Sequence, residues 1–100
     1  MKKTRPLFFF SILTVLFSPH SFAAPPSGMM LSNSCAACHG TKGKSVSSIP
    51  GLNQLSAEEI TIEMKAFKSG ERKATVMGRI AKGFSDKQIK AMSEYLGAKK

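Results

Sequence analysis

The chain has 100 residues, with 15 lysines and arginines against 6 aspartates and glutamates, which gives a net charge of +9. This length allows one small domain and excludes a second domain of ordinary size. The positive charge alone would be compatible with nucleic-acid binding. No recognised nucleic-acid-binding motif accompanies the charge, however, so we expect no nucleic-acid partner.

The first 23 residues have the parts of a secretory signal peptide. Basic residues at the start are followed by an apolar stretch from Leu7 to Phe17, and the small residues Ser21 and Ala23 fit a cleavage site after Ala23. The apolar stretch is too short to span a bilayer as a helix, which needs about 20 residues. We therefore expect residues 1–23 to be removed and residues 24–100 to remain as the domain, exported and without a stable membrane span.

A first helix is predicted over residues 28–37, with Met30, Leu31 and Ser34 on its inner side. This helix leads directly into the next motif.

Removal of the leader takes three positive charges from the chain and leaves +6 on the domain. A domain this small is near the lower limit for a self-sufficient apolar core, so we expect it to need a further stabilising group.

The motif that follows is Cys35-Ala36-Ala37-Cys38-His39. C-x-x-C-H is the attachment pattern of a c-type haem. The two thiols can add to the vinyl groups of haem, and the adjoining imidazole can then bind the iron from the proximal side. We therefore expect Cys35 and Cys38 to hold one haem c covalently and His39 to be an axial ligand.

Three other interpretations of the two thiols compete with haem. An exported chain could form a Cys35–Cys38 disulfide. A thioredoxin-like site belongs to a βαβ pattern, and no strand-like alternation surrounds this motif. A closed zinc site needs four ligands, whereas residues 24–100 contain only these two cysteines and one histidine. That single histidine, His39, also argues against bis-histidine ligation and against a Ser-His-Asp hydrolase.

Residues 41–52 are rich in glycine, serine and lysine and are predicted as a loop. Pro50 lies in a turn within this loop. Its carbonyl oxygen is expected to accept the Nδ1 hydrogen of His39, which would fix the ring and raise the basicity of the ligand. The alternative is a proline that serves the turn alone.

Two longer helices are predicted over residues 56–69 and 85–98. Each begins with a serine, Ser56 or Ser85, followed three residues later by a glutamate or glutamine, which is a capping box. Apolar residues stand on both sides of each cap in the positions of a hydrophobic staple. All predicted elements are helical, so the fold class expected is all-α.

Five methionines besides the first residue could supply a sixth ligand to iron. Met29 and Met30 lie just before the first cysteine, whereas Met64 and Met92 fall on the apolar faces of the two longer helices. Met77 instead heads a short segment after a glycine-containing loop, which can pass round the haem to its other face. We expect Met77 to be the ligand. The alternative is that Met77 is one more core methionine.

Helix, C-A-A-C-H-G, proline turn, helix, methionine segment and terminal helix together resemble the class I cytochrome c family over nearly all of residues 24–100. The resemblance implies a small all-α fold of about four helices around one covalent haem. Residues 75–86 more narrowly resemble the cytochrome subunits of flavocytochrome c sulfide dehydrogenases. That likeness implies Met77 as axial ligand, a periplasmic location, and electrons that arrive from a flavoprotein. It also implies that the first and last helices cross, with Leu31 and Tyr95 meeting there.

Three functions are consistent with these features. The first is an electron carrier, not an enzyme, that cycles between Fe(III) and Fe(II) with histidine and methionine as axial ligands. The second is the haem subunit of a flavocytochrome c sulfide dehydrogenase, a sulfide-oxidising enzyme. The third is a haem-based sensor, whose iron would be open to an external ligand.

Seven basic residues lie near the motif, the methionine segment or the adjoining cap. We expect them to surround the exposed haem edge and to attract an acidic redox protein or a flavoprotein subunit. The seven residues are Lys42, Lys44, Arg72, Lys73, Arg79, Lys82 and Lys87. Lys99 and Lys100, in the C-terminal tail, are expected to contribute little.

Overall fold

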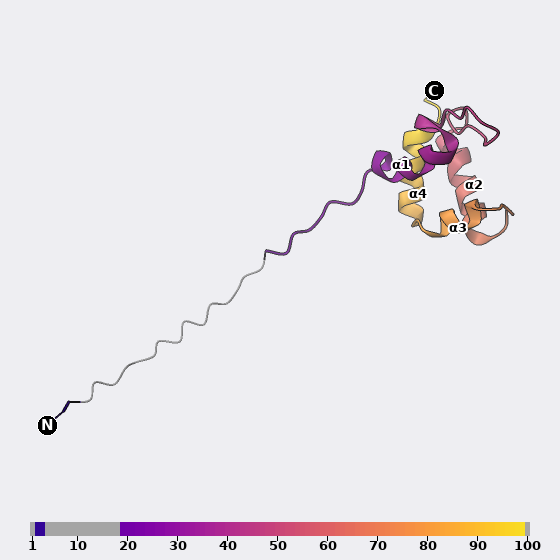
Figure 1. The fold of residues 1–100 in the computed structure, drawn as a ribbon. Coiled ribbons are helices and arrows are strands. Elements are labelled where there is room, and N and C mark those ends of the chain that lie inside the picture. Colours follow the sequence, from indigo (N-terminus) through magenta and orange to yellow (C-terminus); the bar gives the residue numbers. More distant parts are fainter. Residues whose placement is uncertain (1, 4–18, 100) are drawn as a thin grey trace.

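The computed structural model describes residues 2–3 and 19–99 (Figure 1). The predicted signal peptide lies mostly outside these residues, so its removal stays a prediction. Within the described part all regular secondary structure is helical, as the all-α prediction expected. None of the described helices has the length and apolar character of a membrane-spanning segment.

Four α-helices and one short 3-10 turn make up the fold. In chain order they are α1 (Gly28–His39), η1 (Thr41–Gly43), α2 (Ala57–Ser69), α3 (Met77–Lys82) and α4 (Asp86–Leu96). Helix α1 packs against α4, and α2 packs against both α3 and α4. The first and last helices are therefore neighbours, which agrees with the crossing implied by the family resemblance.

The core lies where α2, α3 and α4 meet. Its buried apolar residues are Ile60, Met64, Ala81, Ile89, Met92 and Leu96. The placement of Met64 and Met92 in the core confirms their prediction as core residues. Leu31 and Tyr95, from α1 and α4, both pack against this cluster.

Helices α2 and α4 begin as their sequences predict. In both, the serine hydroxyl accepts the backbone N–H three residues later, and the glutamate or glutamine at that position accepts the serine N–H. Helix α2 ends at Gly70, which has a left-handed φ of 83°. Helix α4 ends at Leu96 rather than at Ala98, because the Ala98 N–H leaves the helix and donates to the carbonyl of Leu55 at 2.7 Å.

The prediction for the inner side of α1 was partly wrong. Leu31 packs against the core, but Met30 is 61% exposed and Ser34 is also exposed. Ser32, only 3% exposed, is buried instead. The inward face of α1 contains small and polar side chains, so an analysis based on apolar spacing places it wrongly.

Helix α1 lies very close to the backbone of α4 at Gly28. A Cβ built on Gly28 would lie 2.1 Å from the carbonyl oxygen of Ala91 and 3.4 Å from the Cβ of Tyr95. Real Cβ atoms do not come that close to backbone, so a side chain here would push the two helices apart. The missing side chain therefore permits this helix crossing.

Gly28→Ala should destabilise the haem-loaded protein by about 1–3 kcal/mol, because the backbone of Ala91 cannot move without displacing α4. Denaturant unfolding followed by circular dichroism measures this change. Gly78→Ala is the matched control, since a Cβ there meets nothing closer than the Phe67 carbonyl oxygen at 3.6 Å. Equal unfolding midpoints for Gly28→Ala and the parent would show that the crossing tolerates a methyl group.

Candidate haem site

His39 is the last residue of α1 and is only 9% exposed. Its Nδ1 lies 2.6 Å from the carbonyl oxygen of Pro50. This contact confirms the predicted hydrogen bond between the two residues. Because a carbonyl can only accept, Nδ1 is the donor, and the lone pair of the neutral ring is then on Nε2. The ring is thus fixed in the tautomer that a metal ligand requires.

Two glycines shape the loop that brings Pro50 to His39. Gly40 ends α1 with a φ of 83°, and a Cβ on it would lie 2.0 Å from the carbonyl oxygen of Lys44. Gly43 has a φ of 72° and accepts the N–H of Leu52 at 2.8 Å. Glycine adopts this left-handed conformation without steric cost. The bond from Leu52 closes the loop and returns residue 50 to the end of α1.

The two thiols lie in the last turns of α1, which runs without a break through the whole C-x-x-C-H motif. Cys35 is half-buried against the core, whereas Cys38 is exposed, and both are free thiols. Burial raises the pKa of the Cys35 thiol, with a smaller opposing effect from a hydrogen bond with Ser34. The helix thus presents both sulfurs and the imidazole of His39 within one short rigid segment.

Met77 is the first residue of α3 and is half-buried against the core cluster. Two apolar neighbours on the same segment, Val76 at 53% and Ile80 at 40%, are exposed. Met29 and Met30 are exposed near the start of α1. Among the described methionines, Met77 alone is neither a core residue nor a fully exposed one, which suits a side chain that serves a bound group.

The residues present fit a covalently attached haem. An imidazole nitrogen and a thioether sulfur are a known axial pair for haem iron, and the two thiols supply the attachment points. Apolar side chains close in sequence to each predicted ligand are exposed, namely Ile49 beside Pro50 and Val76 and Ile80 beside Met77. A large apolar disc between the ligands would remove part of this surface from water, at about 25 cal/mol per Å².

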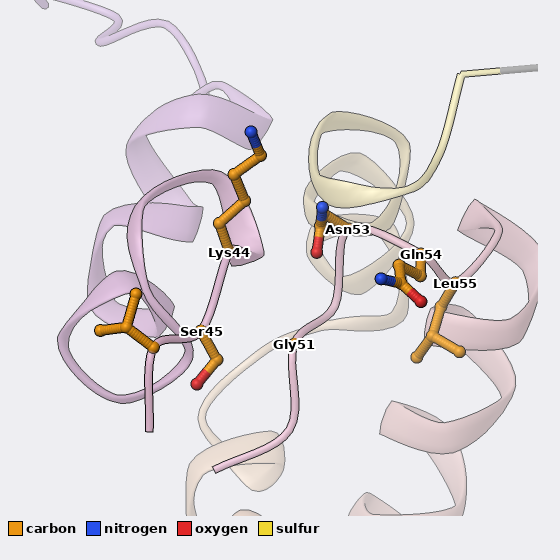
Figure 2. Close-up of a pocket in the computed structure, with 7 residues that line it drawn as sticks. Lys44, Ser45, Gly51, Asn53, Gln54 and Leu55 are labelled. Carbon is orange, nitrogen blue, oxygen red and sulfur yellow. The ribbon is translucent and has the colours of Figure 1, made fainter. Parts of the chain in front are cut away.

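A cavity of about 570 Å³ lies between residues 44–46 and 51–55 (Figure 2). Most of the labelled lining residues are polar. They are Lys44, Ser45, Asn53 and Gln54, and the lining also includes Gly51 and Leu55. None of the predicted thioether or axial residues lines this cavity. The predicted haem-binding residues therefore lie outside the lining of this cavity, and their role stays a prediction.

In the structure, six of the seven predicted docking residues fall into two groups, and the seventh, Arg72, differs from both. All seven are exposed. Lys73 precedes α3, Arg79 and Lys82 lie on α3, and Lys87 lies in the first turn of α4. We call these four residues the α3 basic surface. Lys42 and Lys44 lie elsewhere, beside the C-terminal end of α4.

Arg72 differs from the rest of the predicted docking set. Its guanidinium forms an ion pair with Glu63 and lies over the ring of Phe67, 5.0 Å from the ring centre. Its charge is therefore partly compensated within the molecule.

Lys99 was expected to contribute little to docking, and that expectation stays a prediction. Lys99 lines the same cavity as Lys42 and Lys44. The C-terminal segment is held there by the bond from Ala98 to Leu55, which links residues far apart in the sequence. No local signal in the sequence indicates this neighbourhood. Lys100 lies outside the described residues.

A small helical domain with two thiols and a fixed, buried imidazole in one helix has the features of a haem protein of the c type. The cytochrome c family model matches residues 27–99, and the chain belongs to this family. Its members hold haem c covalently and act as electron carriers. The family assignment confirms the predicted fold class and the predicted cofactor.

Three relatives show how far the similarity extends. The chain is 49% identical over 70 residues to the cytochrome subunit of sulfide dehydrogenase from Chlorobaculum tepidum, covering 70% of this chain and 64% of that protein. It is 41% identical over 68 residues to cytochrome c-553 from Helicobacter pylori, covering 66% and 71%. Cytochrome c-553 from Nitratidesulfovibrio vulgaris is 31% identical over 97 residues, covering 92% and 95%. The match to the sulfide dehydrogenase subunit thus spans less than two thirds of that protein.

Proposed function

We propose that this protein is a periplasmic carrier of single electrons in which Cys35 and Cys38 hold one haem c, and His39 and Met77 bind its iron. The observation that carries the proposal is the 2.6 Å contact from Nδ1 of buried His39 to the Pro50 carbonyl. A histidine held in this way offers Nε2 to a metal. When bound, the haem supplies one-electron Fe(III)/Fe(II) chemistry.

The residues proposed to bind the iron would influence its reduction potential and its access to other ligands. The hydrogen bond to Pro50 holds the ring of His39 in one orientation, in which Nε2 would bind the iron. A methionine thioether as the other ligand raises the reduction potential and favours the ferrous state. If His39 and Met77 both held the iron, no position on it would remain for a substrate, which favours transport of electrons over catalysis at iron.

The proposed location depends on residues 1–23 acting as a leader. Its basic start, short apolar stretch and small residues before Ala24 support cleavage there. Residues 24–100 would then remain as a monohaem domain. Mass spectrometry of the protein from a periplasmic extract identifies the first residue and tests the cleavage directly.

The proposed partner is an acidic redox protein, with a flavoprotein dehydrogenase as the more specific candidate. The name of the Chlorobaculum tepidum relative, a cytochrome subunit of sulfide dehydrogenase, supports this candidate. The names of the two c-553 relatives mention no dehydrogenase. The α3 basic surface lies next to Met77 and is the surface we propose for the acidic partner. Flavin absorbance that co-purifies with the haem band would indicate a permanent flavoprotein subunit.

A redox titration with carbon monoxide as a probe tests the carrier proposal against the sensor alternative. The haem should titrate reversibly with one electron, and the ferrous protein should not bind carbon monoxide at neutral pH, because Met77 occupies the sixth position. Absorbance spectroscopy records both results. Rapid carbon monoxide binding by the native ferrous protein would contradict the carrier proposal and favour a sensor.

A further inference from the structure

A second cavity, of about 380 Å³, opens at the C-terminal end of α4. Three lysines line it, Lys42 and Lys44 from the loop after α1 and Lys99 from the end of the chain. The remaining lining residues are Asn53, Tyr95, Leu96, Gly97 and Ala98. Among the described residues that line it there is no aspartate or glutamate, so the charged side chains of this lining are all lysines.

Backbone contacts fix the walls that carry these lysines. Lys42 has a φ of 52° and lies inside the 3-10 turn, where Lys44 donates its N–H to the carbonyl of Thr41 at 3.1 Å. On the other wall, the Ala98 N–H donates to the carbonyl of Leu55. A Cβ on Gly97 would lie only 2.5 Å from the nitrogen of Ala57. Both walls are therefore anchored to the folded domain.

The ion pairs of the described residues involve none of the residues that line this cavity. Carboxylates on α2 and α4 pair with Lys65, Lys68, Arg72 and Lys90. Lys42, Lys44 and Lys99 take part in none of these pairs, and Lys99 instead donates to the backbone carbonyl of Glu94 at 3.1 Å. The positive charge that remains available to a partner is thus concentrated here and at the α3 basic surface.

The two basic surfaces lie at opposite ends of α4. Figure 1 shows α3 beside the start of α4, whereas the C-terminus lies beyond its other end. Helix α4 has 11 residues, and a helix of that length is about 16 Å long. The Debye length at physiological ionic strength is about 8 Å, so charges at one end are largely screened from the other. The two surfaces can therefore attract partners independently.

We propose that Lys42, Lys44 and Lys99, the C-terminal basic surface, form a second docking site that takes a carboxylate-rich segment of a protein partner. Charge complementarity argues for this occupant, and the cavity is large enough to accept acidic side chains rather than only a single small ion. The inference goes beyond the proposed function, because a carrier that exchanges electrons with one partner at a time needs only one docking surface. With two surfaces it can remain bound to one acidic protein while it meets another.

Nuclear magnetic resonance of the ¹⁵N-labelled, reduced haem protein tests the proposal, with a short peptide of consecutive aspartates as the probe. We expect two groups of saturable shifts, one at Gly97 and Ala98 and one at Gly78 and Gly83. The triple variant Lys42→Gln, Lys44→Gln, Lys99→Gln should weaken binding about tenfold at the first group only, as expected for the loss of three exposed charges.

The matched control is the triple variant Lys73→Gln, Lys82→Gln, Lys87→Gln, which removes the same net charge and should affect only Gly78 and Gly83. Shifts confined to α3, or equal weakening at both groups in both variants, would overturn the second site. Saturable shifts at Gly97 with sodium phosphate at the same strength as with the peptide would show a small-anion site instead. Loss of iron–methionine ligation is read from the haem spectrum, so failure of the proposed function would be seen separately.

Discussion

Replacement of Cys35 and Cys38 by serine will give a protein that releases all its haem on a denaturing gel. Each thiol of α1 makes one proposed thioether, and serine oxygen does not form the corresponding bond. Haem staining of the mature protein measures the result, and the native protein should stain strongly. A double variant that keeps haem through denaturation would refute the attachment site.

The single variants separate the two sulfurs. Cys35 is half-buried against the core, whereas Cys38 is exposed. Either change to serine should leave one thioether and a reduced stain. Protein without haem should also lose much of its helical circular dichroism, because a domain this small has little apolar core of its own. A native spectrum in the haem-free double variant would show that the helices form without the cofactor.

Met77→Ala will abolish the near-infrared sulfur-to-iron charge-transfer band of the ferric protein and lower its reduction potential. The thioether that favours Fe(II) is removed, and the iron becomes open to carbon monoxide or cyanide. Near-infrared absorbance and a redox titration measure the two effects. This variant tests the part of the proposed site that depends least on local sequence signals.

Two other methionines serve as matched controls for the loss of a methionine side chain. Met64 and Met92 are buried, at 8% and 2% exposure, in the core cluster. Their replacement by alanine should cost about 2–5 kcal/mol of unfolding free energy and leave the band in place. If the band persisted in Met77→Ala and disappeared in Met64→Ala or Met92→Ala, the ligand would lie on a helix that we assign to the core.

Features set by neighbouring residues could be predicted from the sequence. The capping boxes at Ser56 and Ser85 depend on residues three positions apart, and the end of α2 depends on a glycine that can adopt a positive φ. The contact between His39 and Pro50 spans a short loop, which the glycines in its sequence predict. These features determine most of the proximal half of the candidate site.

Features that arise from contacts between distant elements could not be predicted in the same way. The inward face of α1 contains Ser32 and the bare backbone of Gly28, and neither has the apolar character that marks a buried position. The neighbourhood of Lys99 and Lys42 depends on the path of the last residues past Leu55. Small residues at helix crossings and charges at chain ends are thus placed only once the fold is known.

If the chain is exported as we propose, the contact between α1 and α4 would determine when folding can finish. Helix α1 would cross the membrane before α4, the helix against which it packs and which lies at the far end of the chain. During that interval the core residues Ile89 and Met92 are still absent from its surroundings. Cys35, half-buried in the finished domain, is therefore open to reagents along with Cys38 while translocation continues. The period in which haem can reach both sulfurs without hindrance is thus set by the time that the last residues take to cross.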